Sequence, residues 1–161
     1  MSTSTTARAW VAQLDDAEAV AELLVAFRDH QDLSWPSENA FLATVERLLE
    51  NPETEFLLAA PDATAAPAGV LQLRFRLSVW RAAPDAWLED LFVHEHARRA
   101  GLGDVLVKLA FERALARGAK RMELDCNEEN APALALYERH GFSPRSKGGA
   151  GRNLFLGRSL A

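Results

Sequence analysis

A glycine turn, a pair of neighbouring carboxylates and a single tyrosine are the residues of this chain whose types and spacing could do chemistry. The turn runs from Arg98 to Gly103 and contains Gly101 and Gly103. Glycines let a backbone approach an anion closely, and a helix N-terminus offers unpaired N–H groups with partial positive charge. A pyrophosphate is the natural ligand of such a turn. Because the same spacing also occurs in plain strand-to-helix connections, the surrounding elements must decide.

The elements that position these residues follow from the spacing of apolar side chains. Strands are expected at residues 8–14, 54–60, 71–79, 86–93, 121–126, 142–145 and 153–160. Over 71–79 apolar and polar residues alternate, which predicts one buried and one polar face. Helices are expected after a capping-box-like start at Asp15 and Glu18, around 41–49, from the glycine turn to Gly118, and from an Asn130 cap to Gly141.

This order of elements predicts an α/β fold with a mixed sheet and helices on its faces. A chain of 161 residues fits one domain, expected over 7–161 after a disordered tail at 1–6. The doubly wound dinucleotide-binding fold fails as an explanation of the glycine turn. Its third glycine would fall on Leu106, and several elements precede the turn.

Two motifs in the right order make the chain resemble the GCN5-related N-acetyltransferase (GNAT) superfamily over roughly residues 86–142. Arg98, Gly101 and Gly103 match the acetyl-CoA loop of that family. Downstream, its pattern N-x-x-N-x-x-A-x-x-L-Y-x-x-x-G-F is matched by Asn127, Asn130, Ala133, Leu136, Tyr137, Gly141 and Phe142. The segment Leu88–Val93 looks like the corresponding strand of small-amine acetyltransferases, including the polyamine branch.

The resemblance implies a mostly antiparallel mixed sheet in which two parallel central strands splay apart, here 86–93 and 121–126. It implies acetyl-CoA as cosubstrate and no metal. The cofactor-binding residues that it implies are Leu91, Phe92, Val93, Arg98, Arg99, Ala100, Gly101, Leu102, Gly103 and Asn130. A backbone N–H near Phe92–Val93 would polarise the acyl carbonyl. For Asn130, a plain helix cap is the alternative.

The resemblance also suggests catalytic roles. Glu89 is the candidate general base and Asp90, which must point to the opposite face of the strand, is the reserve and a candidate substrate ligand. Tyr137 is the candidate general acid toward the coenzyme A thiolate. The alternatives are a structural or substrate-orienting carboxylate at Glu89 and a core aromatic at Tyr137. Phe27 and Trp35 are candidate walls of the substrate site, although Trp35 could equally be core.

Composition narrows the partners. The net charge of −5 disfavours nucleic acid, since phosphate binding needs clustered Lys and Arg. We expect no signal peptide, no membrane span and a cytoplasmic location; the single cysteine, Cys126, excludes an intramolecular disulfide and fits a core position. His94 and His96 lack the further ligands of a metal site and are expected in a solvated loop.

The sequence therefore predicts an N-acetyltransferase that moves an acetyl group from acetyl-CoA directly to a primary amine of a small molecule, through a ternary complex. Its acceptor could be a polyamine, an aminoglycoside, an amino acid or another amine. Two alternatives stay open: acetylation of a protein N-terminus or lysine, and a non-catalytic acyl-CoA-binding module. The oligomeric state cannot be read from the sequence, and because the resembled family often dimerises, a homodimer is one possible assembly.

Overall fold

The computed structural model describes residues 6–145 and 148–160, which fall into two compact units, Met1–Glu123 and Leu124–Ala161. Residues 1–5 of the expected N-terminal tail lie outside the described residues. The single domain over 7–161 stays a prediction.

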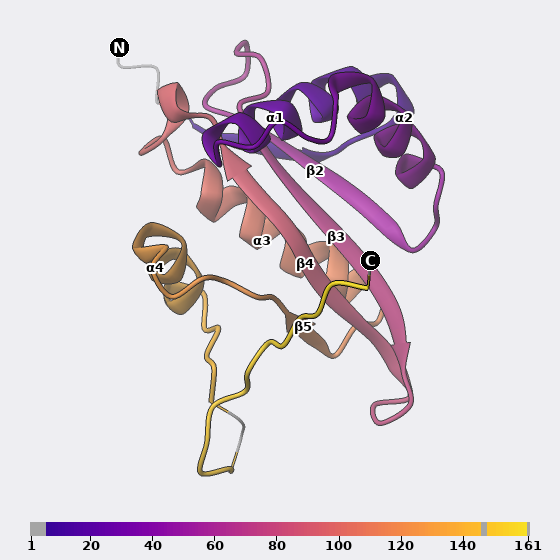
Figure 1. Cartoon of the computed structure of the whole chain (residues 1–161), viewed down its shortest axis with the longest axis vertical. Coiled ribbons are helices and arrows are strands. Elements are labelled where there is room, and N and C mark those ends of the chain that lie inside the picture. Colours follow the sequence, from indigo (N-terminus) through magenta and orange to yellow (C-terminus); the bar gives the residue numbers. More distant parts are fainter. Residues whose placement is uncertain (1–5, 146–147, 161) are drawn as a thin grey trace. The chain divides into compact units, whose positions relative to one another are not determined.

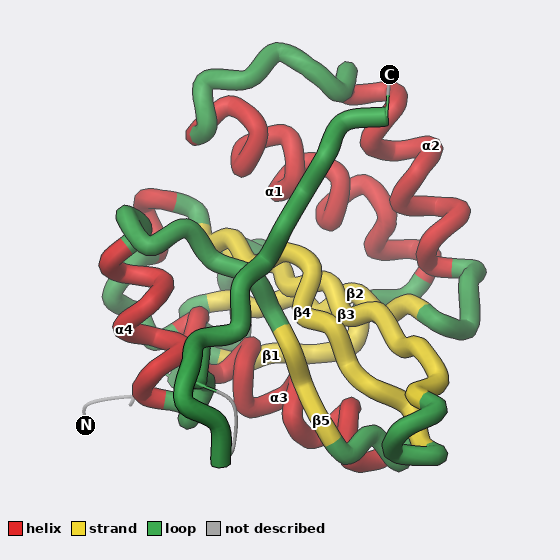
Figure 2. The backbone as a smooth tube through the Cα atoms, turned by 60° about the horizontal axis from the view of Figure 1, so that its bottom comes forward, coloured by secondary structure: helices red, strands yellow, loops and turns green. Residues whose placement is uncertain are grey.

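The first unit is built on a mixed sheet whose strands follow one another in chain order (Figure 2). Within the described residues the strands are β1 (Arg8–Val11), β2 (Thr54–Ala60), β3 (Gly69–Ser78), β4 (Ala83–Val93) and β5 (Arg121–Glu123). Neighbouring strands are antiparallel up to β4, whereas β5 runs parallel to β4. The predicted α/β fold with a mixed, mostly antiparallel sheet is confirmed.

Helices cover both faces of this sheet. Helices α1 (Ala17–His30) and α2 (Glu38–Leu49) lie on one face, and α3 (Leu102–Ala116) lies on the other (Figure 1). We call these the pocket face and the α3 face. Helix α2 begins where the Ser37 hydroxyl accepts a hydrogen bond from the Ala40 N–H at 3.2 Å, which satisfies one unpaired donor of the first turn.

The start of α1 differs from the prediction. The first strand stops at Val11 instead of Leu14, and a 3₁₀ turn over Leu14–Asp16 precedes the helix. The carboxylate that reaches back belongs to Asp16, whose Oδ2 accepts from the Gln13 N–H at 2.8 Å. The predicted capping box at Asp15 and Glu18 was therefore wrong, because the 3₁₀ turn moves the capping contact to an earlier pair of residues.

Two hydrophobic cores result, one on each face. Phe56, Leu58, Val70 and Phe92 pack under α1 and α2. On the α3 face, a Cβ on Gly69 would lie 3.2 Å from Leu106 Cδ1 and 3.6 Å from Ala59 Cβ, so the absence of a side chain lets α3 pack closely against the sheet. The β3–β4 hairpin extends further. Its tip residues Leu77 and Val79, predicted on a buried face, are exposed.

The second unit contains α4 (Ala131–Arg139) and little other regular structure. The strands predicted at 142–145 and 153–160 are wrong for the described residues, which show one isolated antiparallel bridge between Arg145 and Arg152. An alternating pattern makes a strand only where a neighbour accepts its backbone hydrogen bonds. Strand β5 is likewise shorter than predicted and ends at Glu123.

Candidate active site

Strand β4 carries the residues around which the site is organised. Along its β3 edge the pairing is regular except at one irregularity: Gln72 pairs with Asp90, but the next residue, Leu73, pairs with Leu88. Glu89 is therefore the extra residue of a β-bulge, which breaks the alternation of side chains and re-aims them locally. The two candidate carboxylates thus differ in environment.

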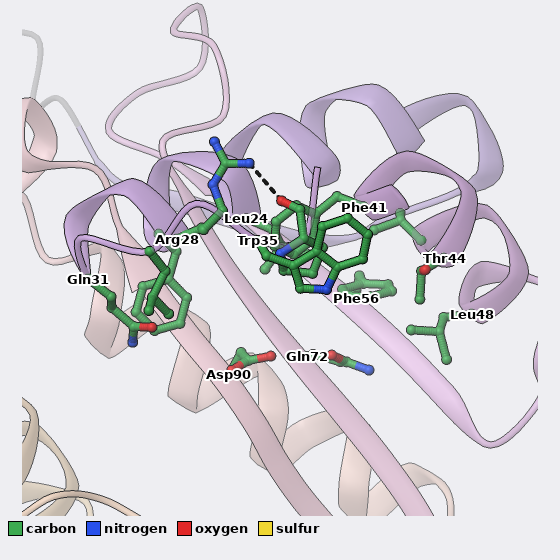
Figure 3. Close-up of a pocket in the computed structure, with 14 residues that line it drawn as sticks. Leu24, Arg28, Gln31, Trp35, Phe41, Thr44, Leu48, Phe56, Gln72 and Asp90 are labelled. Atoms are coloured by element: carbon green, nitrogen blue, oxygen red, sulfur yellow. Dashed lines mark hydrogen bonds between the residues drawn. The ribbon is translucent and has the colours of Figure 1, made fainter. Parts of the chain in front are cut away.

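Asp90 lines a pocket of about 240 Å³ between the sheet and the helices α1 and α2 (Figure 3). The same pocket is lined by Phe27 and Trp35, so the structure brings together the three predicted substrate-binding residues. Trp35 is 71% exposed and forms the rim, which answers the question of whether it is core. Phe27 stacks on Phe92 with ring centroids 5.1 Å apart.

Glu89 is not among the residues that line this pocket, and its side chain is exposed. Asp90 is half-buried. The structure therefore places Asp90, the reserve candidate for the general base, at the bottom of the pocket. Glu89, the first candidate, lies outside the lining of the pocket. An exposed carboxylate at the bulge exchanges protons readily with bulk water.

Several pocket residues were not singled out from the sequence. Gln72 forms the base of the pocket beside Asp90, and Phe56 and Phe41 form part of its walls (Figure 3). The alternation of its strand predicts Gln72 on the polar face. The sequence does carry one signal, because Gln72 is uncharged whereas the next two polar residues of the strand are Arg74 and Arg76.

The predicted cofactor loop has the backbone that its glycine suggests. Gly101 is the N-cap of α3 with φ +79°, and an added Cβ there would meet no described atom within 4 Å. Because α3 spans fifteen residues, its first N–H groups, from Leu102 onward, form an aligned set of donors with no intrahelical partner. This open, donor-rich turn fits a pyrophosphate.

The two arginines of the loop differ in their contacts. Arg98 turns back, with its Nε donating to the Val93 carbonyl at 3.2 Å and its Nη2 lying 3.4 Å from His30 Nε2. Arg99 is exposed, as is Ala100. Arg98 therefore links the loop to the end of β4, while Arg99 is open to a ligand.

Leu102 and Phe92 contribute their side chains to the core. Leu102 is 1% exposed and Phe92 is 6% exposed. Any contact of these two residues with a cofactor must therefore come from their backbone. For Leu102 that group is an N–H in the first turn of α3.

Among the described residues, the far edge of β4 has no strand partner over the part that leads to this loop. β5 pairs with β4 only over Asp85–Trp87. The His94 N–H donates to the Ala68 carbonyl at 2.7 Å. Since ladder bonds alternate along an antiparallel strand, the N–H of Phe92 points to β3 and those of Leu91 and Val93 point to the opposite edge. Val93, and not Phe92, therefore has the N–H available to an acyl chain on that edge.

Asn130 and Tyr137 belong to the second unit. The Asn130 Oδ1 accepts a hydrogen bond from the Ala133 N–H at 3.3 Å, which makes Asn130 the N-cap of α4 as predicted. Tyr137 lies in α4, is 8% exposed and packs edge-on against Phe142 with centroids 5.8 Å apart. The ring is part of a small core, whatever its hydroxyl does.

Electrostatics elsewhere support the fold. Arg81 donates hydrogen bonds to both carboxylate oxygens of the buried Asp85, and these bonds hold the pKa of Asp85 below its usual range. Cys126 is half-buried, and burial followed by the nearby Asp125 charge raises the pKa of its thiol, which disfavours a nucleophilic role.

The described residues contain no cluster of three or more His, Cys, Asp or Glu that could hold a metal. Likewise, none of the helices in that part of the chain is long and apolar enough to cross a membrane. His94 and His96 stack with centroids 4.2 Å apart; His96 is exposed, while His94 is half-buried.

Comparisons with known proteins agree with this geometry. An N-acetyltransferase of Bacillus subtilis (strain 168), the uncharacterized YhfO, is 33% identical over 133 residues, which cover 81% of this chain and 86% of that protein. A mycothiol acetyltransferase of Beutenbergia cavernae is 41% identical over 70 residues, 42% of this chain and 24% of that protein. The crystal structure of a candidate acetyltransferase from Arthrobacter sp. FB24 superposes with a TM-score of 0.86 at 28% identity, covering 99% of both chains.

The acetyltransferase (GNAT) family model matches residues 17–142. This range contains the pocket, the bulged strand, the glycine turn and the capped helix with its tyrosine. Acetyl-CoA is the cosubstrate of the family, and the open loop at the start of α3 fits its pyrophosphate. The chain belongs to the GNAT family and is an acetyl-CoA-dependent N-acetyltransferase.

Proposed function

We propose that the enzyme transfers the acetyl group of acetyl-CoA directly to a primary amine of a small molecule, with both substrates bound in one ternary complex. The observation that carries this proposal is the arrangement along β4. Asp90 faces the pocket, and the next residues present the N–H groups of Leu91 and Val93 at the unpaired edge. An amine in the pocket and an acyl group on this edge would therefore lie close together.

When bound, acetyl-CoA supplies the thioester carbonyl carbon that the amine nitrogen attacks. The loop from Arg98 to Gly103 would hold the pyrophosphate with backbone N–H groups and with the exposed charge of Arg99. The N–H of Val93 would donate to the acyl oxygen as negative charge develops there. Asn130 would add a contact from the start of α4 in addition to capping that helix.

Three side chains are assigned roles in the reaction, and two of them move protons. Asp90 orients the amine from the bottom of the pocket. Glu89 takes the proton that the attacking amine loses, through water where needed, and its exposure lets it return that proton to solvent. The Tyr137 hydroxyl donates a proton to the departing coenzyme A thiolate, which requires that hydroxyl to stand near the sulfur in the ternary complex.

A small-molecule acceptor is proposed over a peptide for two reasons. The strand Leu88–Val93 looks like that of small-amine acetyltransferases. The pocket, at about 240 Å³, is below the roughly 300–1,000 Å³ of sites that bury drug-sized ligands.

The test is a coenzyme A release assay with acetyl-CoA and a panel of amines and peptides, followed by mass spectrometry of the acetylated product. We expect turnover on small primary amines. Turnover on peptides alone would favour protein acetylation, and acetyl-CoA binding without turnover on any acceptor would favour a binding module.

A further inference from the structure

We propose that the acceptor is a small primary amine with a flat apolar body, such as an arylalkylamine, and that Gln72 and Asp90 together bind its amino group. This proposal rests on the proposed function and names the acceptor class of the same pocket. It is carried by the contrast between the polar base of the pocket and its apolar walls.

The base of the pocket is a polar pair set by strand register. Gln72 and Asp90 are direct cross-strand partners on β3 and β4, on the same face as Phe56, which pairs with Gln72 from β2. Adjacent partners on one face lie close enough for both side chains to reach one small group. Figure 3 shows the two side chains next to each other below the aromatic residues.

Gln72 is a buried amide directed into the pocket. The residue is 6% exposed and lines the pocket beside Asp90. Buried polar groups in proteins are almost always hydrogen-bonded, so an amide that lines a pocket is suited to bind a polar group of a ligand or a water there. The Gln72 carbonyl oxygen can accept one N–H of an amine, and the Asp90 carboxylate can accept another.

The walls are mostly apolar, and their polar side chains besides Arg28 are Gln31 and Thr44. The apolar lining includes Leu24, Phe27, Phe41, Val45 and Phe56, with Trp35 and Leu33 at the rim. An aromatic ring placed here would be desolvated and could stack or pack edge-on against these rings.

Arg28 does not add a cationic group to this pocket. Its Nη1 donates to the Pro36 carbonyl at 2.6 Å, and its Nη2 lies 2.7 Å from Asp29 Oδ1. In Figure 3 the guanidinium points away from Gln72 and Asp90. Its aliphatic stem is the part that lines the pocket. The positive charge of Arg28 is therefore not directed at a cationic amine bound beside Gln72 and Asp90.

These features disfavour two other acceptor types. Among the described residues that line the pocket, Asp90 is the one carboxylate, so the second ammonium of a diamine would lack an acidic partner. An aminoglycoside would bury many hydroxyl groups against apolar walls, and a buried hydroxyl without a partner is unfavourable. A monoamine with an apolar body can place its amino group at Gln72 and Asp90 and its apolar part against the apolar walls.

The test compares 2-phenylethylamine, putrescine and kanamycin as acceptors at one pH and one acetyl-CoA concentration. We expect kcat/KM for 2-phenylethylamine to exceed that for the other two by at least about tenfold, the scale of one well-placed polar or apolar contact. A higher value for putrescine or kanamycin would overturn the acceptor class and leave acetyl transfer to small amines intact.

Two variants test Gln72 itself. Gln72→Met keeps the size of the side chain and removes its polar atoms, whereas Gln72→Asn keeps the amide on a shorter stem without adding a second charge beside Asp90. With 2-phenylethylamine we expect Gln72→Met to raise KM about tenfold with kcat little changed, and Gln72→Asn to raise KM less than Gln72→Met does. A wild-type KM in a folded Gln72→Met enzyme would remove Gln72 from the amine site. If either variant fails to fold, the acceptor ranking of the wild type decides.

Binding without turnover is measured separately by the fluorescence of Trp35 at the rim. We expect 2-phenylethylamine to change the emission of the wild type, and Trp35→Phe to abolish that change. If no amine is acetylated but 2-phenylethylamine still binds in this way, the proposed reaction fails and the pocket assignment stands. If 2-phenylethylamine neither binds nor reacts while other amines do, the inference about the pocket fails.

Discussion

The two faces of the sheet are built from the same strands but differ in packing. On the α3 face, Leu71 and Leu73 of β3 pack with Leu102 and Leu106 of the helix, and all four are at most 1% exposed. On the pocket face, the residue between those two leucines is Gln72, and the sheet opens into a cavity. One face is close-packed and the other leaves room for a ligand, so substitutions on the two faces should separate stability from activity.

The largest effect on activity is expected for substitutions on β4, which carries both candidate carboxylates, Glu89 and Asp90. Glu89→Gln removes a proton acceptor and keeps the shape, so kcat should fall by roughly 10²–10⁴-fold with acetyl-CoA binding unchanged. Asp90→Asn should act mainly on KM for the amine, because Asp90 orients it. Steady-state kinetics of both variants decide. A normal Glu89→Gln enzyme beside an Asp90→Asn enzyme with collapsed kcat would transfer the role of base to Asp90.

The α3 face should respond in the opposite way. Leu106→Ala deletes buried methyl groups at a fully buried position and should lower the free energy of unfolding by about 2–5 kcal/mol, while turnover per folded molecule is preserved. Leu115→Ala is the matched control, since Leu115 lies on the same helix and is 73% exposed; it should change stability by less than about 0.5 kcal/mol. Urea denaturation measures both. Equal effects would mean that the α3 face is not the tightly packed one.

Tyr137 extends the comparison to the second unit. Tyr137→Phe deletes the hydroxyl and keeps the ring packed on Phe142, so the free energy of unfolding should change by no more than about 1–2 kcal/mol. Turnover should fall by roughly 10²-fold if thiolate departure limits the rate. Melting temperature and turnover are measured on one preparation. A thermal shift with full activity on several amines would assign Tyr137 to the core alone.

The smallest effect concerns the start of β4, away from the site. Asp85→Asn breaks the ion pair with Arg81, and because Arg81 is one third exposed the loss at pH 7 should be about 1–2 kcal/mol. The pKa of Asp85 is lowered in the folded state, so its contribution is complete above the ordinary value of 3.8 and is lost as the pH falls through the lowered pKa. The stability gap between wild type and variant should therefore close below about pH 4, measured by urea denaturation. A constant gap down to pH 2 would contradict this origin.

Local signals predicted much of the fold. β2 spans Thr54–Ala60 as expected, α2 ends before Asn51-Pro52, and Asn130 caps α4, because apolar period, proline and capping chemistry act within a few residues. The glycine turn was also predicted, since the left-handed backbone at position 101 favours glycine.

Other features depend on partners distant in the chain. The bulge at Glu89 arises from the register of β3 against β4, and it left the relative placement of Glu89 and Asp90 unpredicted. Gln72 is buried because α1 and α2 cover a face that alternation alone marks as polar. In the described part of the chain, residues 153–160 pair with no strand, and the one isolated bridge, between Arg145 and Arg152, lies just before them.

The central claim is that the loop at the start of α3 binds acetyl-CoA, and the two ends of that helix provide its test. Gly101 and Gly118 have φ of +79° and +80°, both are exposed, and an added Cβ at either meets no described atom within 4 Å. Gly101→Val and Gly118→Val should therefore carry similar backbone strain, about 1–2 kcal/mol or somewhat more for a branched residue.

Isothermal titration calorimetry of acetyl-CoA against the wild type and these two variants separates strain from binding. We predict that Gly101→Val, once shown to be folded, loses most of its affinity for acetyl-CoA, because the valine side chain occupies the space through which phosphate oxygens approach the backbone. Gly118→Val should bind acetyl-CoA as the wild type does. Unchanged affinity in a folded Gly101→Val protein, or an equal loss in both variants, would contradict the assignment of this loop to the cofactor.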